Sequence, residues 1–132
     1  MTYDIIIGID PDVEASGVAT LCPKTKRIEA TTMTLSALTD DFRRVRNEYP
    51  TLTVAVVVEA SWATAHNFHS LPSDSKAVAA KKGYKVGRNH QIGIDIADIA
   101  RHFSLDVRLQ PPRRKIWKGN DRKITHEEIC AI

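Results

Sequence analysis

Two short runs of apolar residues each end on an acidic residue. Residues 5–9 read Ile-Ile-Ile-Gly-Ile and lead into Asp10, while residues 54–58 read Val-Ala-Val-Val-Val and lead into Glu59. An unbroken apolar run of this length is typical of a strand covered on both faces, as in sheets flanked by helices. Pro11 follows Asp10 directly and has no N–H to donate, so the first strand should end there. The pattern predicts two central strands that each terminate in a carboxylate.

The rest of the chain alternates between strand and helix patterns. Short apolar stretches bounded by turn residues predict three further strands, at 18–21, 27–35 and 106–109. Capping residues and 3.6-residue periodicity predict three helices, from a cap at Ser36 or Thr39 through Tyr49, at 92–103, and from about residue 125. Residues 61–86 show no clear period. The order β-β-β-α-β-α-β-α predicts an α/β fold with a mixed sheet of about five strands flanked by helices.

The composition of the chain mainly excludes several classes of protein. The chain has 132 residues, of which 42% are hydrophobic and 27% charged, as expected for one globular domain. No apolar stretch is long enough to span a bilayer, and the N-terminus lacks a signal-peptide layout. The two cysteines, Cys22 and Cys130, lie far apart without a C-x-x-C motif. A zinc site is therefore disfavoured, and we expect a cytoplasmic protein with reduced thiols and no membrane partner.

The two strand-terminal carboxylates suggest a metal site. Asp10 alone also fits a plain strand end that opens an Asp-Pro turn. A second carboxylate, Glu59, at the rim of the same sheet changes this interpretation, because like charges held close repel unless a cation lies between them. Carboxylate oxygens suit Mg²⁺, which takes one or two protein carboxylates and completes its shell with water and substrate phosphate.

Charge is distributed unevenly around this expected site. The net charge is +3, but acidic residues outnumber basic ones over residues 1–60 and the reverse holds over 61–132. Basic side chains gather in two segments, 76–88 and 113–123. Such segments also occur as ordinary solvated surface. An acidic site flanked by basic segments is nevertheless what an enzyme acting on a polyanion requires, since the bases can hold phosphates.

Four motifs, taken in order, resemble one known family across nearly the whole chain. They are Gly8-Ile9-Asp10-Pro11 with Gly17, then Val57-Val58-Glu59-Ala60, then Gly87-Arg88-Asn89-His90-Gln91-Ile92-Gly93, and finally Pro111-Pro112 with Lys115, Lys118-Gly119 and Lys123. In this order they resemble the RuvC-type Holliday junction resolvases of the RNase H-like superfamily. The resemblance implies a metal-dependent endodeoxyribonuclease that acts on branched DNA, in particular four-way junctions.

The resemblance also implies roles for individual residues. Two-metal hydrolysis would use Mg²⁺, for which Mn²⁺ can substitute, with Asp10 bridging both ions and Glu59 binding one. A homodimer would match the two symmetric strands of a four-way junction. Trp62 could stack on an unpaired base, or serve as a partly buried loop anchor. The residues expected to bind DNA are Lys82, Arg88, Lys115, Lys118, Arg122, Lys123 and Trp62.

The C-terminus departs from the family pattern. In the family, the last helix carries further aspartates that complete the metal site, whereas here only Glu127 and Glu128 follow Lys123. Glu128 is better explained as the partner of Thr125 in an S/T-x-x-E capping box. We therefore expect one RNase H-like domain over 1–132, incomplete at its C-terminus, that binds branched DNA and cuts it poorly or not at all.

Other functions remain open at this point. A non-catalytic nucleic-acid-binding relative would keep the fold and the basic segments without a full set of carboxylates. A nuclease without junction preference would keep the acids. An actin-like or sugar-kinase ATPase would share the strand ending at Asp10, but it needs a far longer chain.

Overall fold

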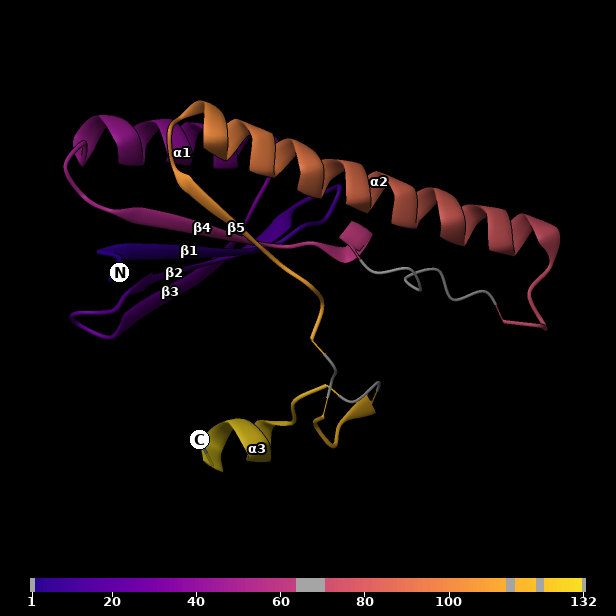
Figure 1. Cartoon of the computed structure of the whole chain (residues 1–132). Coiled ribbons are helices and arrows are strands. Elements are labelled where there is room, and N and C mark those ends of the chain that lie inside the picture. The colour runs from indigo at the N-terminus through magenta and orange to yellow at the C-terminus, as the bar shows by residue number, and fades with distance from the viewer. Residues whose placement is uncertain (1, 64–70, 114–115, 121–122, 132) are drawn as a thin grey trace.

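A mixed five-stranded sheet forms the centre of the molecule in the computed structural model, which describes residues 2–63, 71–113, 116–120 and 123–131 (Figure 1). The strands are β1 (Ile5–Asp10), β2 (Ser16–Cys22), β3 (Arg27–Met33), β4 (Val54–Glu59) and β5 (Asp106–Gln110). Their order is β3-β2-β1-β4-β5; β2 is antiparallel to both its neighbours, and β4 is parallel to β1 and β5. The predicted α/β class and the mixed sheet of five strands with helices packed on it are confirmed.

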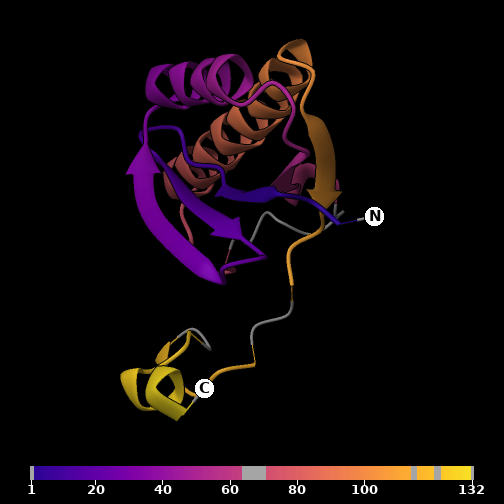
Figure 2. The same ribbon diagram turned by 90° about the vertical axis from the view of Figure 1, so that its left-hand side faces the viewer.

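The long helices lie on one face of this sheet. The helical elements named here are α1 (Leu35–Glu48), the short 3₁₀ helix η1 (Ser61–Ala63), α2 (Lys76–His102) and α3 (His126–Ala131). Helices α1 and α2 cover the same face, whereas α3 lies apart from the sheet in both views (Figures 1 and 2). The expectation that the central strands are covered on both faces is therefore wrong for the described elements. None of the described helices combines the length and apolar character that a bilayer crossing requires.

The hydrophobic core fills the space between the sheet and these two helices. Side chains alternate along a strand, so every second residue of β1 and β4 points toward α1 and α2. The largest fully buried side chains come from both layers: Ile7, Val56 and Val58 from the sheet, and Leu38, Phe42 and Ile96 from the helices. The intervening positions, including Gly8 and Asp10, face away from the helices. This alternation decides which side of the sheet can carry chemistry.

Helix α1 begins earlier than its predicted caps. Thr34, rather than Ser36 or Thr39, is the N-cap, and its side chain accepts a hydrogen bond of 3.2 Å from the Ala37 N–H. Thr39 instead lies inside the helix, where its hydroxyl donates to the Leu35 carbonyl at 2.8 Å. Several Ser and Thr residues in a row each fit a cap locally, so the sequence did not distinguish them.

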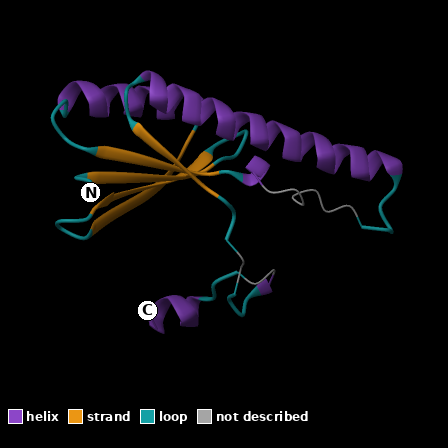
Figure 3. Cartoon of the chain, viewed as in Figure 1, coloured by secondary structure: helices purple, strands orange, loops and turns teal. Residues whose placement is uncertain are grey.

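Helix α2 begins far earlier than the predicted start at Ile92. Its N-cap is Ser75, which accepts a 3.2 Å hydrogen bond from the Val78 N–H, and the helix runs for 27 residues (Figure 3). The first half carries mostly exposed side chains and two helix-weakening glycines, Gly83 and Gly87, so it lacks the apolar stripe that marked the second half. This added length matters, because it brings the middle of α2 to the ends of β1 and β4.

Candidate metal and nucleic-acid site

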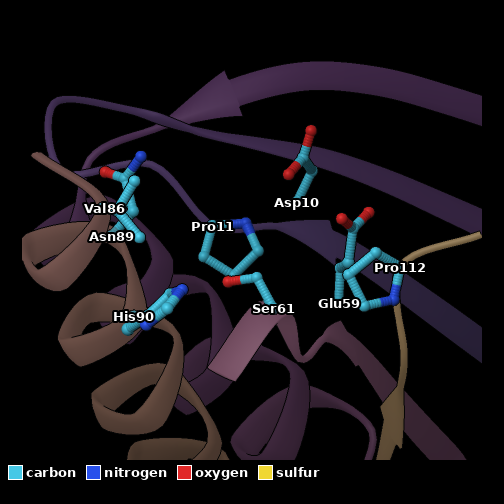
Figure 4. Close-up of a pocket in the computed structure, with 8 residues that line it drawn as sticks. All are labelled: Asp10, Pro11, Glu59, Ser61, Val86, Asn89, His90 and Pro112. Carbon is cyan, nitrogen blue, oxygen red and sulfur yellow. The ribbon is translucent and has the colours of Figure 1, made fainter. Parts of the chain in front are cut away.

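Asp10 and Glu59 lie side by side at one edge of the sheet. The parallel pairing of β1 with β4 aligns Ile9 with Val58, so the next residue of each strand is one of the two acids. Neighbours in register on parallel strands point to the same face, and here that face is opposite to the helices. Figure 4 shows the two carboxylates next to each other. The predicted juxtaposition is confirmed, while the metal-binding role of these residues stays a prediction.

A cavity of about 250 Å³ opens beside the two carboxylates. It is lined by the acids, by the residues that follow them and by the middle of α2: Asp10, Pro11, Glu59, Ser61, Val86, Asn89, His90 and Pro112 (Figure 4). Asp10 is exposed, and no side chain in the described part of the chain forms an ion pair with it. Asp10 therefore presents its negative charge and its carboxylate oxygens to solvent at this cavity.

The two carboxylates fit a single, largely hydrated Mg²⁺. This cation usually takes one or two protein carboxylates and keeps several waters. Within the residues that the structure describes, no group of three or more His, Cys, Asp or Glu side chains could hold a metal ion together. Asp10 and Glu59 are thus two candidate ligands for one cation, and no group of three such ligands occurs among the described residues.

Two cavity-lining residues of α2, Asn89 and His90, are among those that were not assigned a role from the sequence. Asn89 and His90 lie within the glycine-bounded motif 87–93, of which only Arg88 was expected to reach DNA. Successive residues on a helix point about 100° apart, so the identity of the cavity-lining positions depends on where α2 passes the strands. Arg88 is exposed, and its guanidinium lies over the Tyr84 ring at 5.3 Å from the ring centroid.

Trp62 lies in η1, the short helix that follows β4, three residues after Glu59. Its side chain is partly buried and packs against the hydrophobic core. This placement favours the loop-anchor interpretation of Trp62, in which the ring holds the segment after β4 against α2. Base stacking by Trp62 remains an untested prediction.

Of the other residues expected to bind DNA, those that the structure describes are not among the residues that line the cavity. Lys82 forms an ion pair with Asp74, with Nζ and Oδ2 2.6 Å apart, close to the start of α2. Lys118 and Lys123 are exposed at the two ends of a tight turn in which the Gly119 N–H donates to the Lys123 carbonyl at 2.9 Å. Lys115 and Arg122 lie outside the described residues. Their contacts with DNA remain predictions.

The capping box before α3 is confirmed. The Thr125 N–H donates to Glu128 Oε2 at 2.8 Å, and the Glu128 N–H donates to Thr125 Oγ1 at 3.3 Å. Glu128 Oε1 also accepts from the Lys118 N–H at 3.0 Å. The Glu128 carboxylate therefore joins Lys118 to the start of α3.

This arrangement predicts a pH-dependent cap. The backbone N–H of Thr125, followed by that of Lys118, holds the pKa of Glu128 below its usual range. A carboxylate with a lowered pKa in the folded state stabilises the fold above the unfolded pKa, and this contribution is lost as pH falls through the folded pKa. On acidification below the usual glutamate range, the Thr125 and Lys118 amide NMR signals should shift together. Glu128→Gln should remove the transition and Glu127→Gln should preserve it; a transition that survives in Glu128→Gln would contradict this assignment.

Comparisons with known proteins give a distant structural likeness. No family model and no curated protein matches this sequence. Among solved structures, the chain is similar to RuvC from T. thermophilus in complex with a Holliday junction substrate, with 15% sequence identity and a TM-score of 0.39. The match covers 83% of this chain and 66% of the RuvC chain, so this protein spans about two thirds of the length of that neighbour.

Proposed function

We propose that this chain is a metal-dependent endonuclease domain that acts on branched DNA, with Asp10 and Glu59 as its metal ligands. One observation carries the proposal: two parallel strands end in register on two carboxylates that share one face and one cavity. A bound Mg²⁺ would lower the pKa of an attacking water and neutralise charge on the scissile phosphate. Mn²⁺, with the same preference for oxygen ligands, should substitute.

The chain's own residues would do the remaining work. Asp10 and Glu59 hold the cation on the open face of the sheet, where a DNA backbone can approach without displacing a helix. Arg88, Lys118 and Lys123, which are not among the residues that line the cavity, would bind phosphates, which suits a substrate larger than the cavity itself. The net charge of +3 favours association with a polyanion. A homodimer would present two such sites to the two symmetric strands of a junction.

A non-catalytic DNA-binding domain is the second candidate. It is favoured by one observation: among the described residues, no group of three or more His, Cys, Asp or Glu side chains could hold a metal ion. With two carboxylates, we expect slow cleavage at most. Each catalytic metal supplies several kcal/mol of charge stabilisation in the transition state, and about 1.4 kcal/mol corresponds to a factor of ten in rate.

The deciding experiment compares two labelled substrates of identical sequence, a synthetic four-way junction and a linear duplex. Binding is measured in Ca²⁺ and cleavage in Mg²⁺ or Mn²⁺. We expect tighter binding to the junction and slow, metal-dependent cutting. Binding without cleavage would support the non-catalytic candidate. Equal cleavage of both substrates would show that the chain does not prefer the junction. No binding to either substrate would reject the proposal.

Charge reversal of Lys118 and Lys123 should weaken DNA binding without changing sequence preference. Phosphate contacts release counterions, so each lost contact should reduce the slope of log K against log salt by roughly one. The measurement is fluorescence anisotropy across a salt series on several DNA sequences. Lys24→Glu, an exposed position in the turn between β2 and β3, is the matched control. Equal affinity of the double variant and this control at low salt would leave the two lysines as ordinary surface.

A further inference from the structure

Helix α2 touches the chain segments that follow both carboxylates. Gly93 is buried in this contact, and a Cβ built on it would fall within 3.0 Å of Trp62 Cζ3, closer than real Cβ atoms approach other groups. The same Cβ would lie 3.1 Å from Trp62 Cη2 and 3.2 Å from Pro11 Cγ. Pro11 directly follows Asp10, and Trp62 is three residues beyond Glu59. Only glycine at position 93 allows the helix to approach both segments this closely.

A second contact lies one helical turn earlier. Asn89 is four residues before Gly93 and therefore on the same face of α2. Its Oδ1 accepts a hydrogen bond of 3.0 Å from the Val13 N–H. The loop between β1 and β2 is thus fixed at Pro11 by packing and at Val13 by a hydrogen bond, both from one face of one helix.

The sheet alone leaves the pair of carboxylates incompletely constrained. The pairing of β1 with β4 extends to Ile9 and Val58 and stops one residue short of the acids. Asp10 is paired with Gly17 of β2, and Glu59 with Gln110 of β5. Each acid is therefore held by its outer neighbour, and no backbone pairing joins the two acids directly.

We propose that Asn89 and Gly93 are positioning residues that set the separation of Asp10 and Glu59 by clamping the segment after each acid. The need for a clamp follows from charge and geometry: adjacent carboxylates repel, and Mg²⁺ demands near-ideal octahedral geometry at about 2.0–2.1 Å. This proposal rests on the proposed function, because the clamp acts on the metal site that the function requires. The expected consequence is that loosening α2 weakens metal binding before it unfolds the domain.

The chain offers a matched pair of substitutions in this helix. Gly93→Ala inserts a methyl group into the contact with Trp62 and Pro11, whereas Gly87→Ala inserts the same group where no atom lies within 4 Å. Both changes raise helix propensity equally. Mn²⁺ affinity, measured by electron paramagnetic resonance of the free ion, should fall by roughly 10-fold or more in Gly93→Ala, as for other groups that orient metal ligands. It should be unchanged in Gly87→Ala, whose urea midpoint should rise.

A double-mutant cycle separates the clamp from general damage. Trp62→Leu removes the ring atoms that Gly93→Ala would strike, so it should itself weaken Mn²⁺ binding, and the added effect of Gly93→Ala in that background should be small. Asn89→Ala gives a second variant with no steric clash. It should also weaken Mn²⁺ binding and should speed hydrogen exchange of the Val13 amide.

The outcomes distinguish this proposal from the proposed function. If folded Gly93→Ala binds Mn²⁺ as tightly as the wild-type chain, the clamp is overturned and these contacts are packing alone. If Gly93→Ala does not fold, the same result in Asn89→Ala overturns the clamp. No Mn²⁺ binding by the wild-type chain would reject the metal site. In that case two other measurements test the clamp: the hydrogen-exchange rate of the Val13 amide in Asn89→Ala, and the fluorescence emission of Trp62 in Gly93→Ala made in a Trp117→Phe background. If both are unchanged, the clamp is rejected as well.

Discussion

Asp10→Asn should abolish metal-dependent cleavage and greatly weaken Mn²⁺ binding while leaving the fold intact. The substitution keeps the shape of the side chain but replaces a charged ligand by a neutral amide. If one metal contributes several kcal/mol to the transition state, its loss should reduce the rate by about 10²–10⁴-fold. Stability should not fall, because Asp10 is exposed and its removal relieves repulsion with Glu59.

The measurements are Mn²⁺ titration, junction cleavage and urea unfolding of the same preparations. Glu14→Gln is the control, since it removes one charge from an exposed acid in the loop that follows β1. Glu59→Gln should act in the same direction as Asp10→Asn. Undiminished Mn²⁺ affinity in Asp10→Asn, with the control also unchanged, would show that the cation binds elsewhere and would remove the basis of the proposed function.

Phe42→Ala should have the largest effect on stability. Phe42 is the largest fully buried side chain, only 1% exposed, and lies between α1 and the sheet. Truncation of a buried phenylalanine costs about 3–5 kcal/mol through lost burial and the cavity left behind. Small domains have total stabilities of roughly 5–15 kcal/mol, so the variant should be close to unfolding.

Urea denaturation followed by circular dichroism measures this effect. Tyr84→Ala is the control, because Tyr84 is 67% exposed on α2 and surface substitutions usually change stability by less than about 0.5 kcal/mol. Equal midpoints for Phe42→Ala and Tyr84→Ala would mean that the packing of α1 on the sheet contributes little to the fold.

Features that depend on local chemistry could be predicted from the amino-acid sequence. Apolar runs that stop at Asp10 and Glu59 predicted two strands and their ends, because a buried strand cannot continue through a carboxylate and a proline. Thr125 and Glu128 predicted a capping box, because both partners lie within one turn of helix. The order of these elements along the chain was sufficient to predict a mixed sheet. The parallel pairing of β1 with β4 places the two acids side by side.

The residues that surround these acids could not be predicted, because they come together through long-range packing. The first half of α2 protrudes beyond the sheet and therefore has no apolar stripe. Hydrophobic periodicity could not predict that the helix begins at Lys76. The sequence also suggested helices on both faces, whereas the described helices pack on one and leave the face with Asp10 open. Asn89 and Gly93 are far along the chain from Val13, Pro11 and Trp62, the residues that they contact after the two acids. Their convergence depends on the path of one long helix across the strand ends, which no local pattern encodes.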